Sequence, residues 1–401
     1  MKNTSAQSQN TSALESISGL KNSSRSLPKD FAADQNIEET KTPPASISTD
    51  SSLDDILIYA RHHLASDVHL SPNNQIFFRI YGSLKAQGAD KLTAEKIRTK
   101  IHTLLRPEQL SEFTERGDME LVHTIPGAGR YRITLIKQRQ GLDVTARIIP
   151  SSILTFEQST MPASCANLTK WAQGLILVTG PASCGKTMSL SVLVEMINQT
   201  RHEHIITIEN PIEIVYTPKH CQITQRELNK HTLSQANALK ASLREDPDII
   251  VVSELRDIES IRLAVTAAET GHLVFGTMNT NNAYQTVFSL INSFPPEEQG
   301  VIANMISESL RGVISQHLIP KKDNTGMIPA YEVLLQSTAI SAMIREGRIQ
   351  QINNSIAMGK TAGMVLMDNS LQELVQKGVI DGKEAFYRAT TPGTFKQYLN
   401  N

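Results

Sequence analysis

Residues 174–187 read GLILVTGPASCGKT, an apolar run followed by a glycine-rich turn and a Lys-Thr pair. The two glycines, Gly180 and Gly185, stand with that pair at the spacing G-x-x-x-x-G-K-[ST], in which backbone N–H groups and the start of a helix bind phosphate oxygens. In this pattern the lysine reaches the β- and γ-phosphates and the hydroxyl binds Mg²⁺. The sequence therefore predicts a site for ATP and Mg²⁺ formed by Gly180, Pro181, Ala182, Ser183, Cys184, Gly185, Lys186 and Thr187.

Further apolar runs follow the loop and alternate with helical patterns. They read HIITIEN at 204–210, DIIVVSEL at 248–255 and HLVFGTM at 272–278, and the helical segment DIESIRLAVTAAE at 257–269 separates the last two. Strands that are apolar throughout and separated by helices indicate a parallel sheet with helices on both faces. We therefore predict an α/β domain over residues 165–320.

The flanking regions have different compositions. Residues 1–51 are rich in Ser, Thr, Asn, Gln and Lys and hold too few large apolar side chains to offset chain entropy, so we expect a disordered extension. Short β-like runs with two helical patterns between them predict a compact α+β domain over 52–150. We expect a linker at 151–164 and a mixed, mostly helical region at 321–401.

Charge and composition exclude some classes of protein. The 401 residues include 39 Lys and Arg against 40 Asp and Glu, so no net field favours binding to DNA or anionic lipid. The apolar runs are far shorter than the roughly 20 residues of a membrane span. The three cysteines form no CxxC pair, which argues against disulfides and structural zinc. We predict a cytoplasmic protein that binds no nucleic acid.

Two glutamates end predicted strands beside the loop. Glu254 closes the run DIIVVSEL and Glu209 closes HIITIEN. P-loop enzymes place at strand ends the carboxylate that polarises the attacking water or holds Mg²⁺. A glutamate in this position is also common as a solvated residue at a sheet edge. Two such residues near one phosphate loop favour a catalytic interpretation for both.

Several motifs occur in an order that resembles a known family. The segments are ASDVHLS at 65–71, GPASCGKT at 180–187, TIENPIE at 207–213, LREDPDIIVVSELRD at 243–257, AAETGHLVFGT at 267–277 and ESLRGVISQHLIP at 308–320. The middle four resemble the Walker A, Asp box, Walker B and His box of the type II/IV secretion ATPases. Within that superfamily the chain is most similar to the type IV pilus retraction motors of twitching motility, the PilT/PilU family.

The resemblance implies a fold, an assembly and further site residues. It implies a PAS-like N-terminal domain, a RecA-like P-loop domain and a hexameric ring of ATPase subunits. It places nucleotide between the two domains, with Mg²⁺ held by Thr187 and Glu209, and with arginines supplied by the N-terminal domain. The candidates for these roles are Arg130, Arg132 and Arg139 for the phosphates, Arg244 as a sensor, and His272 with Glu254 and Glu209 as catalytic groups. Arg139 matches a PilU-like placement, because many retraction motors have arginine one position later, at Gln140 here.

The same resemblance suggests partners. Pilus-assembly and secretion motors of the superfamily usually carry a four-cysteine zinc insertion, which the cysteines of this chain cannot build. That absence favours a retraction-type subunit in a ring of identical or paralogous chains. Such a ring would work at the cytoplasmic face of the inner membrane, against a platform protein of the pilus machine.

The chain also departs from the family pattern. Asn210 stands where the Asp box has a second acid, Ser253 replaces a glycine before Glu254, and Asn279 replaces the second histidine of the His box. Asn279 can donate a hydrogen bond to a phosphate oxygen but cannot carry a proton. The segment AISAM at 339–343 matches only loosely a motif that, in the family, serves retraction. Three hypotheses remain: an active retraction motor, a weakly active accessory paralogue and, least favoured, a nucleic-acid motor.

Two positions inside the loop also depart from expectation. Ser183 replaces the family's internal glycine, a change expected to matter little. Cys184 sits at a helix start near Lys186, where we expect a lowered thiol pKa and alkylation that blocks ATP binding.

Overall fold

A computed structural model of the chain describes residues 40–399. The predicted disordered extension lies largely outside this range, but its last residues are described and make specific contacts. The backbone N–H groups of Thr40 and Lys41 both donate to the carbonyl of Gly127, at 2.9 and 2.7 Å. Lys96 forms an ion pair with Asp50 at 2.7 Å. The expectation of disorder up to residue 51 is therefore wrong for its final part, because backbone and polar contacts hold a segment that has few apolar side chains.

The N-terminal domain contains one six-stranded antiparallel sheet in the order β3-β2-β1-β6-β5-β4. Its strands are β1 (Asp67–Leu70), β2 (Ile76–Ile80), β3 (Ser83–Gln87), β4 (Asp118–Ile125), β5 (Gly129–Gln138) and β6 (Gly141–Ile149). Its helices are α2 (Leu53–His62), α3 (Ala94–His102) and α4 (Pro107–Arg116). Alternate side chains of β5, namely Tyr131, Ile133 and Leu135, are buried in its core, as expected of a strand with one solvated face. The sequence predicted this α+β unit but missed β3, whose five residues are mostly exposed.

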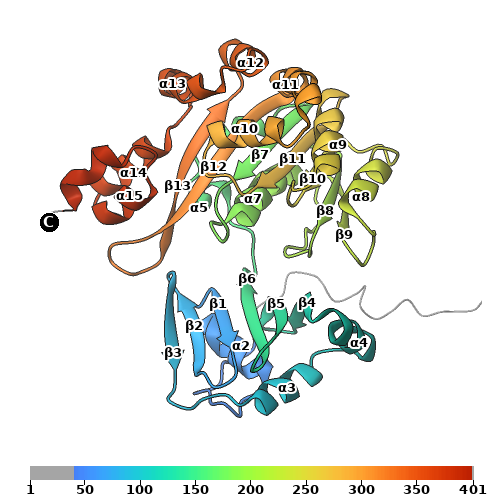
Figure 1. Ribbon diagram of the computed structural model, residues 1–401, viewed down its shortest axis with the longest axis vertical. Coiled ribbons are helices and arrows are strands. Elements are labelled where there is room, and N and C mark those ends of the chain that lie inside the picture. The colour runs from blue at the N-terminus through green and yellow to red at the C-terminus, as the bar shows by residue number, and fades with distance from the viewer. Residues whose placement is uncertain (1–39, 400–401) are drawn as a thin grey trace, which may run out of the picture. The chain divides into compact units, whose positions relative to one another are not determined.

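The C-terminal part is built on a seven-stranded sheet in the order β13-β12-β7-β11-β10-β8-β9 (Figure 1). The strands are β7 (Gly174–Thr179), β8 (His204–Glu209), β9 (Gln222–Glu227), β10 (Ile249–Val252), β11 (Leu273–Met278), β12 (Leu310–Pro320) and β13 (Met327–Leu335). All neighbours pair in parallel except β12 with β13. The predicted parallel α/β fold is confirmed, although β9, β12 and β13 were not foreseen as strands.

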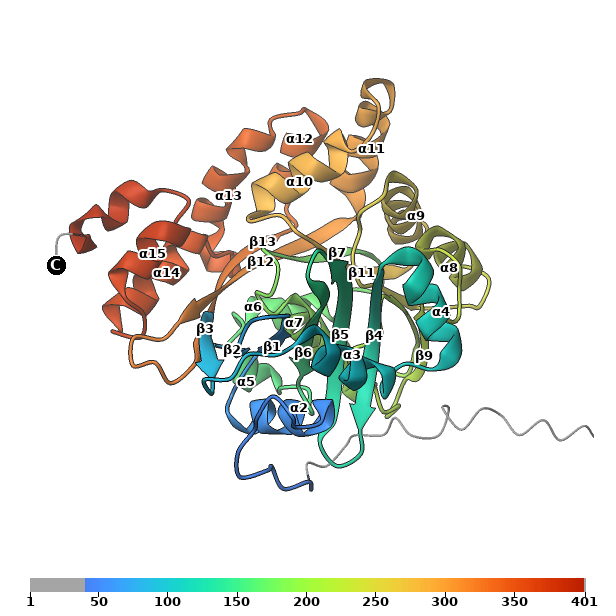
Figure 2. The ribbon, with the colours of Figure 1, turned by 60° about the horizontal axis from the view of Figure 1, so that its bottom comes forward.

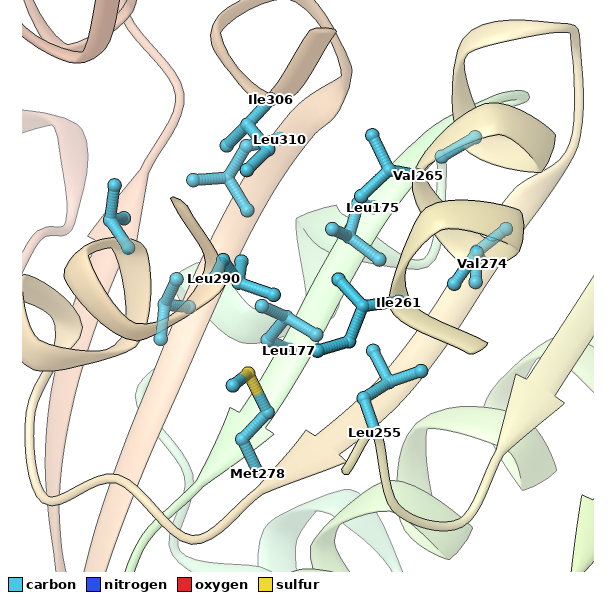
Figure 3. Packing of buried hydrophobic residues seen from close by; sticks show 14 of the residues in the cluster. Leu175, Leu177, Leu255, Ile261, Val265, Val274, Met278, Leu290, Ile306 and Leu310 are labelled. Carbon is cyan, nitrogen blue, oxygen red and sulfur yellow. The ribbon is translucent and has the colours of Figure 1, made fainter. Parts of the chain in front are cut away.

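The two faces of this sheet carry separate apolar cores. Along β7, Leu175 and Leu177 belong to the core shown in Figure 3, whereas Ile176 and Val178 belong to the core on the opposite face. The first core includes residues of α9 (Ile258–Glu269), α10 (Ala283–Asn292) and α11 (Pro296–Ser309), and the second includes residues of α7 (Lys186–Thr200). Successive strand residues point to opposite faces, so a strand buried on both faces must be apolar throughout.

The C-terminal boundary of the sheet lies beyond the predicted one. β12 and β13 form an antiparallel hairpin whose pairing runs from Gly312↔Leu335 to Pro320↔Met327. A boundary at residue 320 would cut this hairpin, so we propose that the α/β domain ends after β13. The helices that follow are α12 (Thr338–Arg345), α13 (Ile352–Met358), α14 (Met367–Gln376) and α15 (Gly382–Arg388). Of these, α14 and α15 pack together on the outer ends of the hairpin (Figures 1 and 2).

The predicted linker also packs on the core of the α/β domain. It contains α5 (Phe156–Ser159) and leads into α6 (Ser164–Leu168). Met161 and Cys165 are buried there, and Phe156 packs against the apolar core to which they belong. None of the helices between residues 40 and 399 combines the length and apolar composition needed to span a membrane.

Candidate nucleotide site

The phosphate-binding loop lies at the carboxyl end of β7 and leads into α7. Gly185 is the residue before α7 and has a φ of 93°, and Gly180 has a φ of 143°. A Cβ on Gly180 would collide with the carbonyl oxygen of Gln316. Both positions therefore require glycine, for conformation and for space. The backbone N–H groups at the start of α7 have no partner within the helix, which makes this end suited to an anion.

Ser183 has a left-handed backbone, with a φ of 63°. For a residue with a side chain this conformation costs roughly 1–2 kcal/mol. The loop therefore keeps the glycine-type backbone at this position, and serine adopts it at a conformational cost that glycine would not carry.

Lys186 is held by the loop itself. Its Nζ donates to the carbonyls of Gly180 and Pro181, at 2.7 and 2.9 Å, and to Oδ1 of Asn279 at 2.8 Å. Partial burial lowers the pKa of Lys186, while the nearby Glu254 acts in the opposite direction. The lysine is thus already positioned at the loop before any phosphate binds.

Asn279 connects Lys186 to Glu254. Its Oδ1 accepts from Lys186, and its Nδ2 donates to Oε1 of Glu254. The second carboxylate oxygen of Glu254 pairs with Arg256 at 2.7 Å. Asn279 follows β11 and Glu254 follows β10, and parallel strands bring their carboxyl ends to one edge of the sheet. The structure thus unites three of the residues predicted from sequence in one hydrogen-bonded chain.

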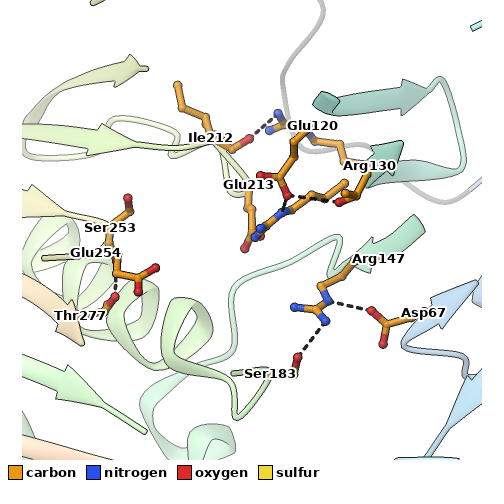
Figure 4. A network of polar contacts seen from close by, with 12 residues as sticks. Asp67, Glu120, Arg130, Arg147, Ser183, Ile212, Glu213, Ser253, Glu254 and Thr277 are labelled. Carbon is orange, nitrogen blue, oxygen red and sulfur yellow. Dashed lines mark hydrogen bonds and ion pairs between the residues drawn. The ribbon is translucent and has the colours of Figure 1, made fainter. Parts of the chain in front are cut away.

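Ser253, which precedes Glu254, makes contacts through its backbone. Its N–H donates to the carbonyl of Ile208 at 3.0 Å, and its carbonyl accepts from the hydroxyl of Thr277, as Figure 4 shows. Ser253 therefore ties the end of β10 to both neighbouring strands.

Glu209 lies apart from the loop. Its strand, β8, is separated from β7 by β11 and β10, which amounts to three strand spacings or about 14 Å. Its carboxylate accepts from the Thr207 hydroxyl at 2.6 Å and from the Gln225 amide at 3.0 Å. Burial raises the pKa of Glu209 to about 7, against the opposing effect of these hydrogen bonds. The structure does not bring Glu209 and Thr187 together as a shared Mg²⁺ site.

His272 and Arg244 lie at the opposite edge of the sheet. His272 directly precedes β11, and its carbonyl accepts from the N–H of Gly174, where β7 begins. Its ring nitrogen Nδ1 is 3.0 Å from the carbonyl of Ala267. Arg244 is exposed and precedes β10. The catalytic and sensor roles predicted for these two residues find no support within one chain, because the loop follows the other end of the strands.

The predicted arginines of the N-terminal domain divide into two groups. Arg130 donates to the carbonyl of Ile212 at 2.9 Å, and Arg132 pairs with Glu213 at 2.8 Å and with Glu120. Both therefore contact the segment that follows Glu209, as Figure 4 shows for Arg130. Burial acts against the charge of Arg132, but the two glutamates outweigh it and raise its pKa.

Arg139 lies at the other end of the same hairpin. It is exposed in the turn between β5 and β6, whereas Arg130 is at the start of β5. The structure therefore does not bring Arg139 to the loop of its own chain.

Arg147, which the sequence reasoning missed, reaches the phosphate-binding loop. Its Nη2 donates to the Ser183 hydroxyl at 2.8 Å, and its Nε pairs with Asp67 at 2.9 Å (Figure 4). In the β5–β6 pairing Arg147 is directly opposite Arg132. The signal was available, because cross-strand partners share a face and an argument for Arg132 extends to Arg147.

Cys184 is buried, with 3% of its surface exposed. Burial raises the pKa of its thiol, and the nearby Lys186 only partly opposes this. The predicted lowered pKa and ready alkylation are therefore wrong, since the side chain points into the protein rather than towards the open face of the loop.

The residues present fit a nucleotide phosphate and, in part, a magnesium ion. The glycine conformations, the helix start and Lys186 suit a phosphate chain. Thr187 is exposed in the first turn of α7 and is placed to offer its hydroxyl to Mg²⁺. Between residues 40 and 399 no group of three or more His, Cys, Asp or Glu side chains is arranged to hold a metal ion, so the phosphates and water would supply most ligands.

A cavity of about 830 Å³ lies beside α7, away from the loop. It is lined by residues 151–157 and by the later turns of α7, including Val192, Glu195 and Gln199. None of the residues of the phosphate-binding loop lines it.

Comparison with known proteins places the chain among pilus and secretion ATPases. Residues 45–396 match the family described as type II/IV secretion system protein. The type IV pilus retraction ATPase PilT of Pseudomonas aeruginosa is 38% identical over 341 residues, which are 85% of this chain and 99% of PilT. The type IV pilus ATPase PilU of the same organism is 30% identical over 324 residues, which are 81% of this chain and 85% of PilU. The crystal structure of the pilus retraction motor PilT with bound ADP is similar at a TM-score of 0.75 and 34% identity, covering 86% of this chain and 99% of that one.

Proposed function

The chain belongs to the type II/IV secretion system protein family, and on this premise we propose that it is an ATPase motor subunit that powers retraction of type IV pili. Similarity over nearly the whole length of a retraction ATPase supports the proposal. The observation that carries it is the hydrogen-bonded chain from Lys186 through Asn279 to Glu254. This chain puts a phosphate-binding lysine and a carboxylate able to activate water in one site.

Each of the three hydrogen-bonded residues, Lys186, Asn279 and Glu254, has a distinct part in hydrolysis. The loop N–H groups bind the phosphates, and Lys186 turns from the carbonyls of Gly180 and Pro181 to the β- and γ-phosphate oxygens. Glu254 orients the attacking water and accepts its proton. Asn279 keeps Glu254 aligned and offers its amide to the terminal phosphate. Bound Mg²⁺ would neutralise phosphate charge, with Thr187 as its protein ligand.

The first test is the turnover of purified protein with Mg²⁺ and ATP. We expect Lys186→Ala to lose ATP binding, and Glu254→Gln to bind ATP while turnover falls by about 10²-fold or more. Lys240→Ala, a change of an exposed lysine on α8 (Gln235–Ser242) that pairs with Glu259, is the matched control and should leave turnover unchanged. Wild-type turnover no faster than that of Glu254→Gln would contradict the proposal.

Asn279 favours a second candidate, a weakly active accessory subunit that joins a ring with an active paralogue. The amide cannot take up the proton or positive charge that a histidine carries. We expect Asn279→His to raise kcat while the affinity for ATP stays similar, because the change acts on the transition state. The measurement is kcat and KM across pH 6–8. If the wild type turns over ATP rapidly and Asn279→His does not raise kcat, the accessory-subunit candidate fails and only the active motor remains.

We further propose the assembly and location. The chain forms a ring, expected to be hexameric, of identical subunits or with a paralogous retraction ATPase, and acts in the cytoplasm against an inner-membrane platform protein. The similarity to both PilT and PilU supports either ring. The test is the oligomeric mass in solution with ATP, alone and after mixing with a retraction ATPase of the same cell.

A further inference from the structure

A buried amide side chain lies directly beneath the phosphate-binding loop. Gln316, in β12, has 3% of its surface exposed. Its Nε2 donates to the carbonyl of Cys184 at 2.6 Å, and its Oε1 accepts from the hydroxyl of Ser189 at 2.6 Å. Cys184 belongs to the loop and Ser189 to the first turns of α7. One side chain from a distant strand thus holds both the loop and the helix that follows it.

The same residue limits the space available to the loop. A Cβ on Gly180 would collide with the backbone carbonyl of Gln316, and a Cβ on Gly185 would lie 2.9 Å from its side-chain nitrogen. The two glycines that define the loop therefore pack against Gln316, one against its backbone and one against its amide. The contact is steric as well as polar.

The strand that carries Gln316 is fastened to the strand that carries the loop. β12 pairs in parallel with β7, and Ser315 is opposite Thr179, the last residue before the loop. The hydroxyls of these two residues lie 2.8 Å apart and are buried. Gln316 is the next residue along β12, so its position relative to the loop is set by the strand pairing.

We propose that Gln316 is a positioning residue for the ATPase reaction: it holds the carbonyl of Cys184 and the start of α7 so that the loop N–H groups face the phosphates. The proposal rests on the ATP site proposed above. Gln316 does not itself contact the nucleotide, since it lies on the buried side of the loop. Its amide nitrogen donates to Cys184 and its amide oxygen accepts from Ser189, so both ends of the side chain are used.

The chemistry of the side chain predicts which substitutions fail. Gln316→Met keeps the length and apolar packing but leaves the Cys184 carbonyl and the Ser189 hydroxyl without this partner. Gln316→Glu keeps the acceptor for Ser189 but puts a carboxylate oxygen against the Cys184 carbonyl, where a donor is needed. A loop displaced in this way loses binding to ground state and transition state alike, which raises KM and leaves kcat nearly unchanged.

The experiment measures equilibrium binding of a fluorescent ADP, ATPase kinetics and the melting temperature of the full chain. We expect ADP binding about tenfold weaker or more for Gln316→Met and Gln316→Glu, since the ligand must then order a loop that has lost a buried hydrogen bond worth about this factor. We expect kcat within about threefold of wild type at saturating ATP. Ser189→Ala removes one of the two hydrogen bonds and should weaken ADP binding less. In the Ser189→Ala/Gln316→Met double variant, the loss of ADP affinity should be smaller than the sum of the losses in the two single variants.

The matched control is Ser309→Ala. Ser309 is the residue before β12, is 2% exposed, and donates to the carbonyl of Met305, so it is a buried polar group near the same strand without contact to the loop. Removal of the Ser309 hydroxyl should lower the melting temperature and leave ADP binding unchanged. Wild-type affinity in both Gln316 variants, or a change no larger than that of Ser309→Ala, would overturn the proposal. Wild-type protein that binds ADP without hydrolysing it would overturn only the motor function, and wild-type protein that binds no ADP would overturn both.

Discussion

At the scale of single residues, the site is organised by side chains that share hydrogen bonds rather than by isolated charges. Asn279 uses both ends of its amide, one on Lys186 and one on Glu254. Gln316 does the same beneath the loop, between Cys184 and Ser189. An amide can donate and accept at once without a charge, so neither amide has to change its own protonation to make both contacts.

Glu209 is a buried carboxyl group whose contribution to stability should depend on pH. Burial raises its pKa to about 7 in the fold, so the folded state binds a proton that the unfolded state releases near its ordinary value of 4.5. Stability from this group is fully present below pH 4.5 and is lost as the pH rises through about 7. The loss is on the order of 3 kcal/mol.

The check is urea unfolding of the wild type and Glu209→Gln at several pH values. The stability of the wild type relative to the variant should fall between pH 4.5 and pH 8, because glutamine does not titrate. A difference that stays constant over this range would contradict the prediction. Glu195→Gln, a change of a carboxylate on α7 whose pKa is lowered by its hydrogen-bond partners, should not reproduce the effect.

At the scale of elements, the β12–β13 hairpin connects the site to the C-terminal helices. Glu332 in β13 is 2% exposed. Its two oxygens accept from the N–H groups of Ala283 at 2.8 Å and Met367 at 3.2 Å, the first residues of α10 and α14. One buried carboxyl group therefore accepts from the first N–H groups of two helices; burial raises the pKa of Glu332, and these two hydrogen bonds act in the opposite direction. The first of these helices follows directly from the segment that carries Asn279.

Glu332→Gln should destabilise the fold by roughly 1–3 kcal/mol, because a glutamine can accept from only one of the two N–H groups and leaves the other buried without a partner. The measurement is the free energy of unfolding in urea at pH 7.5. The control is Glu308→Gln, at an exposed glutamate 3.6 Å from Arg345, which should change stability by no more than about 0.5 kcal/mol. Equal effects of the two changes would show that Glu332 does not fasten the helices.

At the scale of the whole molecule, the phosphate-binding loop is also held from the N-terminal domain. Arg147 joins Asp67 in β1 to the strained Ser183 in the loop. Ser183→Gly would relieve the left-handed backbone but lose the hydrogen bond, and each amounts to about 1 kcal/mol. The two effects should nearly cancel in the stability of the full chain.

Arg147→Met should behave differently. It leaves the Asp67 carboxylate, whose side chain is 5% exposed, without its cation, so a loss of roughly 1–3 kcal/mol is expected. The Ser183→Gly/Arg147→Met double variant should not be less stable than Arg147→Met alone, because the shared hydrogen bond is lost only once. The measurement is urea unfolding of all three variants. If Ser183→Gly lowered the free energy of unfolding as much as Arg147→Met does, strain and hydrogen bond at Ser183 would not balance, and the prediction would fail.

Local sequence patterns predicted much of the site and less of its surroundings. Gly180, Gly185, Lys186 and Thr187 follow from spacing alone, because a phosphate loop is built from consecutive residues. The position of Glu254 follows from its place at the carboxyl end of a parallel strand, the edge at which the loop also lies. The misplacement of His272 was avoidable, since it precedes its strand whereas the loop follows one, and parallel strands put these ends at opposite edges.

The sequence by itself determined the phosphate-binding loop, the alternation of strands and helices, and the family, because these depend on short-range spacing and on apolar runs that any parallel sheet must bury. The packed fold alone shows that Gln316 supports the loop from below, that Arg147 hydrogen-bonds to Ser183, and that Glu209 lies several strands away from the loop. These outcomes depend on strand order and register between segments more than a hundred residues apart in some cases, such as Ser189 with Gln316 at a separation of 127. Contacts at that range are set by the packing of the whole sheet, and no local pattern of residues encodes them.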